Sequence, residues 1–284
     1  MPALIAQPGM PYWNDLATTN LASAKRFYAG VFDWEFEDVT DNDGGYAVAR
    51  RSGMPVAGVA QVPENNVPLW GVMLYASNVE EAYAQAVAAG GQEALSPREV
   101  EPGVWMAIVV DPCGATIGFK NSNDEIALFA AGEPSTPVWY ELMSGREWEQ
   151  TLDFYHRAAG WDIRTSSATD GFRFAVGEID NASVAGMWDS SKLIEDDAQL
   201  AKSEAPSLWT VYMGVKDMKE ALAKTEEFGG KVARQPWESD FGVMATITDP
   251  EGAVLNLCEV DEYVPSEEEV HEPDLFAPED FQAK

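Results

Sequence analysis

The sequence predicts an α+β fold built from four tandem copies of a βαβββ module. Two observations predict this fold. The chain repeats itself after about 126 residues, and each copy twice contains the order strand, helix and about three strands. The length of 284 residues fits a molecule made of two such halves.

The repeat consists of ordered matches between the two halves. They are Pro11-Tyr12-Trp13-Asn14-Asp15-Leu16 with Pro137-Val138-Trp139-Tyr140-Glu141-Leu142, Phe27-Tyr28 with Phe154-Tyr155, Val56-Ala57-Gly58 with Val184-Ala185-Gly186, and Asp111-Pro112-Cys113-Gly114-Ala115 with Asp249-Pro250-Glu251-Gly252-Ala253. This order indicates a tandem duplication with one half at 8–121, a linker at 122–136 and a second half at 137–260.

The elements of the first half follow from local patterns. A strand over 11–19 precedes a helix that begins after Asn20, because apolar residues then recur at helical spacing. Short strands reach about residue 62. The order then restarts with a strand over 69–77, a helix over 79–89 and strands over 92–120. Asn78 with Glu81 predicts a capped start for that second helix, and Asp217 with Glu220 predicts the same in the second half.

The net charge of the chain limits the classes of molecule that it is expected to bind. The chain has 18 Lys and Arg against 48 Asp and Glu, a formal net charge of −30. Such a surface repels the phosphates of nucleic acids and anionic lipids, so neither is an expected partner. Two acidic segments are not part of the repeat. They are an insert at 189–206, within the second half, and a tail at 261–284, after it. Two cysteines, no apolar run long enough for a membrane helix and no signal-peptide pattern predict a cytoplasmic protein.

The ordered set of motifs resembles the vicinal oxygen chelate superfamily, the glyoxalase, bleomycin-resistance and extradiol-dioxygenase group, in its two-half, four-module bacterial form. The motifs are Phe-Tyr at the end of the first helix of each half and Asp-Pro-x-Gly before its last strand. The resemblance implies that the modules pair into two curved mixed sheets, each with a ligand pocket on its concave face. It also implies a monomer, because the two halves replace the dimer of shorter members.

The resemblance further implies positions for metal ligands, and these positions hold unsuitable residues. They are Trp13, Gly71, Gly118 and the neighbourhood of Gly58 in the first half, and Trp139, Thr210, Asn256 and the neighbourhood of Gly186 in the second. A divalent ion in this family needs His, Gln or Glu, and neither a tryptophan ring nor a glycine provides a ligand. We therefore predict that the protein has neither a metal nor another cofactor.

Strand alternation assigns the residues that face each pocket. In the first half they include Trp13, Asp15, Met73 and Tyr75; in the second half they include Trp139, Glu141, Met143, Thr210, Tyr212 and Asn256. Aromatic and methionine walls with one carboxylate fit a small organic ligand, aromatic or cationic. The alternative is that Trp13 and Trp139 fill the core.

Asp15 and Glu141 are the candidate catalytic residues. As general bases they would serve a lyase, isomerase or hydroxylase that acts next to a carbonyl group. The alternative is a structural role, in which each carboxylate makes a salt bridge or a hydrogen bond to a neighbouring strand or loop; Arg26, Arg98 or Lys120 could supply such a partner. Metal-free binding of a small ligand is the leading hypothesis. Sequestration of a basic drug and a metal-dependent lactoylglutathione-lyase-type activity are further alternatives.

Overall fold

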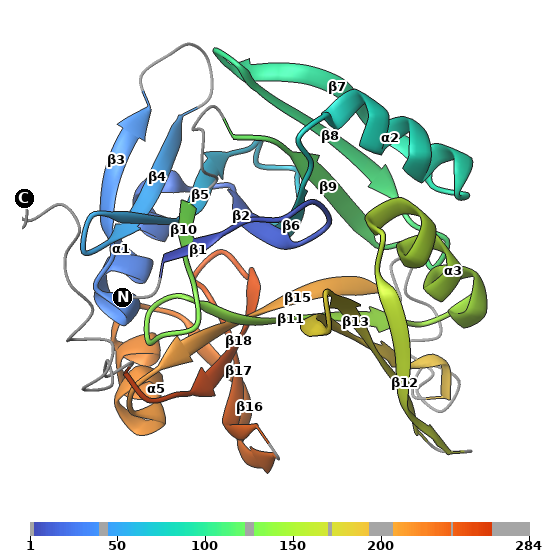
Figure 1. Ribbon diagram of the computed structural model, residues 1–284. Coiled ribbons are helices and arrows are strands. Elements are labelled where there is room, and N and C mark those ends of the chain that lie inside the picture. The colour runs from blue at the N-terminus through green and yellow to red at the C-terminus, as the bar shows by residue number, and fades with distance from the viewer. Residues whose placement is uncertain are drawn as a thin grey trace, which may run out of the picture.

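A computed structural model describes residues 3–39, 45–122, 128–169, 172–192, 207–239 and 241–262. In this part of the chain there are two curved, mixed sheets of eight strands each, a two-stranded ribbon and four helices (Figure 1). The predicted α+β class is confirmed. Residues 193–206 of the acidic insert and 263–284 of the acidic tail lie outside the described residues.

The first sheet has the spatial order β3-β4-β5-β2-β6-β9-β8-β7. Its elements and two helices are β2 (Pro11–Thr18), α1 (Leu21–Phe32), β3 (Glu35–Val39), β4 (Tyr46–Arg51), β5 (Met54–Gln61), β6 (Leu69–Tyr75), α2 (Val79–Ala88), β7 (Gln92–Glu101), β8 (Val104–Val110) and β9 (Thr116–Lys120).

The second sheet repeats that order as β12-β13-β14-β11-β15-β18-β17-β16. Its elements and helices are β11 (Pro137–Ser144), α3 (Trp148–Ala159), β12 (Asp162–Thr169), β13 (Phe172–Ile179), β14 (Ala182–Asp189), β15 (Leu208–Val215), α5 (Met218–Glu227), β16 (Lys231–Ser239), β17 (Gly242–Thr248) and β18 (Val254–Glu259). Each sheet therefore holds two βαβββ modules, as predicted.

Two central antiparallel strands join the modules within each sheet. In β2 and β6, Asp15 lies opposite Gly71, and in β11 and β15, Glu141 lies opposite Thr210. Each central strand also pairs in parallel with the last strand of its own module, β2 with β5 and β6 with β9. The two carboxylates thus occupy equivalent places at the middle of the two sheets.

The predicted helix starts are confirmed. The side chain of Asn78 accepts a hydrogen bond from the backbone N–H of Glu81 at 3.1 Å, and Asp217 accepts one from Glu220 at 2.8 Å. Each cap satisfies a backbone donor that the helix itself leaves without a partner. These caps fix where the helices begin relative to the strands that line the concave faces.

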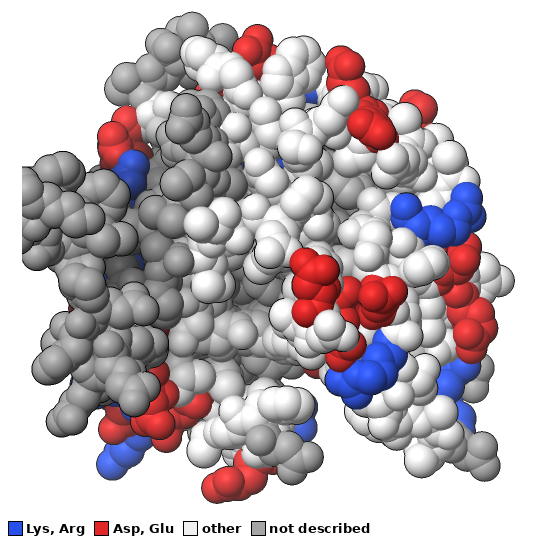
Figure 2. Space-filling view, in the orientation of Figure 1, with Lys and Arg blue, Asp and Glu red and all other residues white. Residues whose placement is uncertain are grey.

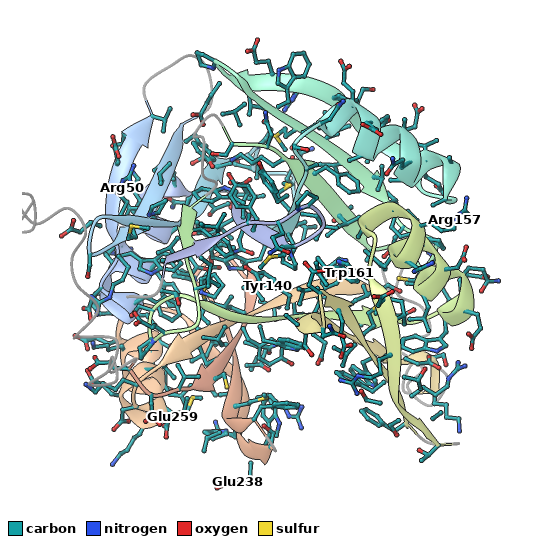
Figure 3. All side chains as sticks on the ribbon, viewed as in Figure 1. Arg50, Tyr140, Arg157, Trp161, Glu238 and Glu259 are labelled. Atoms are coloured by element: carbon teal, nitrogen blue, oxygen red, sulfur yellow. The ribbon has the colours of Figure 1, made fainter. Side chains whose placement is uncertain are left out.

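The convex faces of the two sheets pack against each other, with the helices at both sides of the contact (Figure 1). Helix α1 contacts α5, and α2 contacts α3, so each pair joins the two halves. Tyr140 and Trp161 lie between the sheets (Figure 3). Apolar side chains of both halves form one core cluster there, which includes Leu16, Leu74, Leu142 and Met213. The concave faces are consequently left to point away from each other.

The repeated motifs meet across this contact. The hydroxyl of Tyr28 donates to Asp249 Oδ2 at 3.2 Å, and the hydroxyl of Tyr155 donates to Asp111 Oδ2 at 2.7 Å. Each bond therefore joins the Phe-Tyr motif of one half to the Asp-Pro-x-Gly turn of the other. The tyrosines and aspartates are buried, so a reciprocal pair of bonds links the halves.

The linker contributes to the first half. Its strand β10 (Leu128–Ala130) pairs with β1 (Ala3–Ile5) to form the two-stranded ribbon. Phe129 of this ribbon packs edge-on against Tyr12 with ring centroids 5.8 Å apart. The concave face of the first half is therefore partly covered by the ribbon. Among the described helices, none combines the length and the apolar composition that crossing a membrane requires.

Candidate functional sites on the two concave faces

The concave faces carry small apolar clusters that are separate from the main core. In the first half, Trp13 and Met73 are buried and Tyr75 packs against them. In the second half, Tyr212 is buried and Trp139 packs beside it. The neighbouring residues along the same strands, such as Leu74 and Val211, belong to the main core instead. Alternation along the strands thus separates these side chains from those of the main core.

In the first half, aromatic side chains hold the carboxylate of Asp15. Tyr46 on β4 donates its hydroxyl to Asp15 Oδ1 at 2.8 Å, and the indole N–H of Trp13 donates to the same oxygen at 3.0 Å. Burial raises the pKa of Tyr46 well above its usual value, so its hydroxyl remains a donor. Of the two structural alternatives for Asp15, the structure therefore shows the hydrogen bond to a nearby strand, and neutral donors stand where Arg26, Arg98 or Lys120 was considered.

Gly58 makes this arrangement possible. It pairs with Asp15 across β2 and β5, and a Cβ atom added at Gly58 would lie 2.0 Å from both Asp15 Oδ1 and the Tyr46 hydroxyl. The sequence analysis missed Tyr46, which is 31 positions from Asp15 along the chain. The repeated Val-Ala-Gly motif was the available signal that something packs closely against this glycine.

A cavity of about 180 Å³ remains on this concave face next to Trp13 and Tyr46. Charged side chains at its wall come from Arg50, Glu101 and Lys120. The ammonium of Lys120 lies 4.6 Å from the centroid of the Trp13 ring, which is within the range of a cation–π contact. The first half therefore offers a small pocket with an aromatic wall and charged groups.

In the second half, the carboxyl group of Glu141 has a weaker partner. Tyr212 donates its hydroxyl to Glu141 Oε1 at 3.3 Å. Burial raises the pKa of Glu141 to about 7, and the hydrogen bond from Tyr212 offsets part of that effect. At neutral pH this carboxyl is therefore divided between its neutral and charged forms.

Two other predicted residues of this half make internal hydrogen bonds. The Thr210 hydroxyl donates to the backbone carbonyl of Glu141 at 3.1 Å. The Thr246 hydroxyl donates to Asn256 Oδ1 at 2.8 Å, which leaves the amide N–H₂ of Asn256 as a donor for a ligand. These bonds orient the polar floor of the concave face around Glu141.

The wall beside Glu141 is aromatic. Phe174 occupies the place that Tyr46 has in the first half, and its ring and the Trp139 indole converge over Gly186. Phe172 stacks on Phe174 with centroids 6.0 Å apart. Met143 pairs with Trp188 two positions further along the strands than the pair of Glu141 with Gly186. In the space-filling view, the notch at the lower edge is bordered by uncharged residues and by Lys and Arg side chains (Figure 2).

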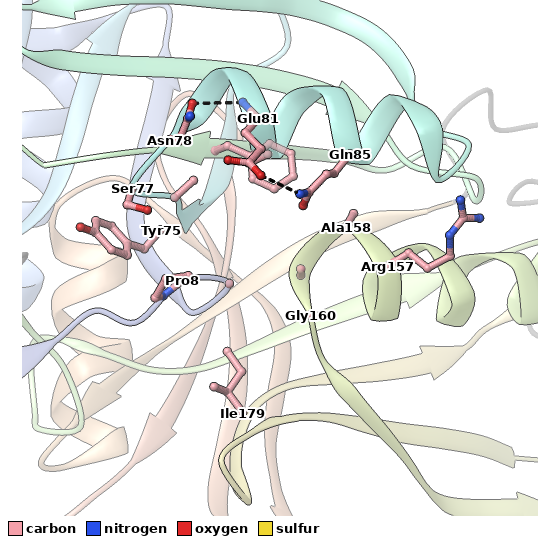
Figure 4. Close-up of a pocket in the computed structure, with 15 residues that line it drawn as sticks. Pro8, Tyr75, Ser77, Asn78, Glu81, Gln85, Arg157, Ala158, Gly160 and Ile179 are labelled. Atoms are coloured by element: carbon pink, nitrogen blue, oxygen red, sulfur yellow. Dashed lines mark hydrogen bonds between the residues drawn. The ribbon is translucent and has the colours of Figure 1, made fainter.

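A larger cavity of about 350 Å³ lies at the edge of the contact between the halves (Figure 4). Tyr75, predicted to line a concave pocket, borders it. Its polar groups bond to each other: Asn78 caps α2, and Gln85 donates to Glu81 Oε1 at 3.4 Å. Arg157 donates to the carbonyl of Ala88 at 3.0 Å. Because these groups are engaged within the protein, we do not assign a site to this cavity.

The residues present do not fit a divalent metal ion. At the positions named by the resemblance, the side chain of Met73 lies over Gly118, and Trp139 lies over Gly186. Among the described residues, no three His, Cys, Asp or Glu side chains come together in a way that could hold an ion. His156, whose Nδ1 donates to the Trp161 carbonyl at 2.8 Å, belongs to the end of α3. His271 lies outside the described residues.

Residues 142–257 match the sequence model of the family described as Glyoxalase/Bleomycin resistance protein/Dioxygenase superfamily. "Putative glyoxylase CFP32" of Mycobacterium tuberculosis (strain CDC 1551 / Oshkosh) is 28% identical over 256 residues, which cover 88% of this chain and 94% of that relative. The anthracycline biosynthesis protein DnrV of Streptomyces peucetius is 26% identical over 278 residues, covering 91% of this chain and 96% of DnrV.

Solved structures of low identity share the fold. The Mn(II)-bound glyoxalase from Novosphingobium aromaticivorans has a TM-score of 0.61 at 16% identity, covering 93% of this chain and 90% of that chain. A mutant of homoprotocatechuate 2,3-dioxygenase from Brevibacterium fuscum has a TM-score of 0.60 at 14% identity, covering 95% and 75%. Both comparisons extend over almost all of this chain, including both sheets.

Proposed function

Since the chain belongs to the glyoxalase, bleomycin-resistance and dioxygenase superfamily, we propose that it binds a small organic molecule on the concave face of its second half. The observation that carries the proposal is the carboxyl of Glu141, held by one long hydrogen bond from Tyr212 beside the half-buried ring of Trp139. A planar aromatic body would stack on the ring, and a polar or cationic group would meet the carboxyl.

The first half supports this choice by contrast. There the equivalent carboxylate of Asp15 accepts two hydrogen bonds from its own protein, and the ribbon covers part of the concave face. In the second half, among the described residues, the indole N–H of Trp139 has no hydrogen-bond partner. A ligand with an acceptor beside its ring would satisfy that donor and the amide of Asn256.

The names of two relatives are consistent with an aromatic ligand. DnrV and DauV are both called anthracycline biosynthesis proteins, and anthracyclines are planar, fused-ring aromatic compounds. We therefore propose a planar aromatic ligand, which fits the aromatic and methionine wall formed by Trp139, Phe174 and Met143. No cofactor takes part in this proposal.

Thermal unfolding with a panel of compounds tests the proposal. The panel contains an anthracycline, benzyltrimethylammonium as an aromatic cation, and tetramethylammonium as the cation without a ring. A compound at about a hundred times its Kd should raise the Tm by about 5 °C or more. The rise should disappear in Trp139→Ala and persist in Trp13→Phe. The proposal fails if the aromatic compounds produce no rise, or if Trp139→Ala retains it.

A second function, proton transfer by Glu141, is favoured by its pKa of about 7. A general base works best when its pKa is near the working pH. Glu141 would take a proton from a carbon next to a ligand carbonyl, and the electron pair left behind would form an enolate. Return of the proton to the same or a neighbouring carbon would give exchange or isomerisation.

Exchange of that proton for deuterium in D₂O, followed by NMR on a carbonyl compound that binds, measures this step. Glu141→Gln should abolish the exchange while the compound still binds. Asp15→Asn is the matched control in the first half and should leave exchange unchanged. Exchange that persists in Glu141→Gln would exclude this role for Glu141.

We also propose that the chain acts as a cytoplasmic monomer that does not bind nucleic acid. The two halves already bury their convex faces against each other, and both cysteines, Cys113 and Cys258, are buried and free. Light scattering after size exclusion should give about the mass of one chain, 31.0 kDa. A stable dimer would contradict this part of the proposal.

A further inference from the structure

We propose that the pocket of the first half binds a second, chemically different ligand, a small aromatic carboxylate whose negative charge lies against Lys120. This inference concerns the other concave face and does not rest on the function proposed for Glu141. Lys120 is 8% exposed. Among the lysines and arginines of the described residues, it is the one that is buried. It ends strand β9 and lines the 180 Å³ cavity beside Trp13.

Lys120 has no protein anion to compensate its charge. Within the part of the chain that the structure describes, no ion pair or hydrogen bond joins its ammonium to a carboxylate. Its contact is the face of the Trp13 ring, 4.6 Å away. Removing an ammonium group from water is costly unless an anion or several acceptors replace the water. A cation placed in this way is suited to an anionic ligand.

The other charged groups of the pocket already have partners or lie at its edge. Arg50 donates to Glu37 at 2.8 Å and to the carbonyl of Gly53 at 3.1 Å. Asp15 accepts from Trp13 and Tyr46 through Oδ1. Glu101, which also lines the pocket, is partly exposed and would repel a second negative charge. These surroundings favour a ligand with a single carboxylate directed at Lys120.

The apolar part of the ligand follows from the size and the lining of the cavity. About 180 Å³ leaves room for one aromatic ring rather than a fused-ring system. Trp13, Tyr46, Val48, Pro55 and Val104 form its walls. A ring between these side chains would direct its carboxylate to the ammonium of Lys120, which lies over the face of Trp13.

The second half shows that the fold itself does not require a lysine at this position. Lys120 pairs with Met106, and its counterpart Cys258 pairs with Met244 at the same register. Cys258 is neutral and buried. A buried charge that a duplicated copy replaces with a thiol is more simply explained by binding than by packing.

Isothermal titration of the full chain with benzoate, benzamide and benzylamine tests the inference. The three probes share one ring and differ in charge. Benzoate should bind at least about tenfold more tightly than benzamide, because a charge-assisted hydrogen bond replaces a neutral one. Benzylamine should not bind in this pocket, so any binding of benzylamine by the second half should be the same in Lys120→Met as in the wild type. Equal affinity for benzoate and benzamide would overturn the inference without any variant.

Variants then locate the site. Lys120→Met should lose benzoate binding by about tenfold or more, and Lys120→Arg should retain part of it. Lys216→Met is the matched control, because Lys216 is an exposed lysine paired with Glu262. It should bind benzoate as the wild type does.

Stability separates binding from a structural role. Lys120→Met should leave the Tm unchanged or raise it, because it removes a buried charge that has no anion. A variant that loses stability but still binds benzoate would show that Lys120 is structural and would overturn the inference. If Lys120→Met fails to fold, the comparison of Lys120→Arg with Lys216→Met decides: benzoate affinity equal in both would place the carboxylate elsewhere.

Discussion

On the faces that the two halves turn toward each other, Tyr28 and Tyr155 make the same bond to the turn aspartate of the opposite half. On the outer, concave faces, equivalent positions hold different side chains. Tyr46 in the first half corresponds to Phe174 in the second, and Lys120 corresponds to Cys258. Burial between the halves preserves the motifs, while the concave faces are free to differ.

This contrast indicates where the chemistry of the molecule lies. The inner faces must pack with each other, so a change in one half needs a matching change in the other. The side chains of a concave face do not pack against the other half, so they are constrained by the ligand that binds there. The first half has a carboxylate satisfied by the protein and a lysine without an anion. The second half has a carboxyl with one weak partner and a neutral thiol.

The largest effect is expected at the inner contact. Tyr155→Phe removes the donor to Asp111, and Tyr28→Phe removes the donor to Asp249; both aspartates are buried. Each change should lower the free energy of unfolding by about 2–3 kcal/mol, because a buried acceptor loses its partner. Urea denaturation measures both. A large loss for one variant and none for the other would contradict the equivalence of the two halves on this face.

The same substitution, Trp to Phe, should lower the free energy of unfolding by different amounts on the two concave faces. Trp13 is 6% exposed and donates to Asp15, so Trp13→Phe should cost about 2 kcal/mol. Trp139 is half-buried and its indole has no partner within the described residues, so Trp139→Phe should cost less than about 1 kcal/mol. The same urea experiment checks this, and equal losses would remove the distinction between the two faces.

Glu141→Gln should change the free energy of unfolding by a smaller amount, and the change should depend on pH. Burial raises the pKa of Glu141 in the folded chain to about 7, above its ordinary value near 4.5. Its contribution to stability is therefore complete below about pH 4.5 and is lost as the pH rises through 7. The variant should gain about 1–2 kcal/mol over the wild type at pH 8 and little at pH 5.

Chemical denaturation of both proteins across this pH range measures the difference. Asp111 and Asp249, whose pKa values burial also raises, occur in both proteins and cancel in the comparison. A difference that does not change with pH would show that Glu141 titrates as an exposed carboxyl does.

The fold and the orientation of the site residues could be predicted from the sequence, because they depend on local patterns. The caps at Asn78 and Asp217 and the alternation along β2 and β11 involve residues close together in the chain. The ordered repeat then supplied the four modules. These signals were enough to separate the concave side chains from the core.

The partners of the site residues could not be predicted, because they come from distant segments. Tyr46 reaches Asp15 from two strands away in the sheet, and Phe129 reaches the first concave face from the linker. Lys120 was considered as a cation for Asp15, but the structure places it over Trp13 instead. A sequence pattern assigns a face to a side chain, whereas the contact it makes depends on how the strands curve.

The NMR signals of the tryptophan indole N–H groups test the difference between the two concave faces most directly. Trp13→Phe and Trp139→Phe would assign the two relevant signals. Benzoate should shift the Trp13 signal and leave that of Trp139 in place, and benzyltrimethylammonium should do the reverse. If both compounds shift the same indole, or neither shifts one, the two faces have not diverged in the chemistry they bind.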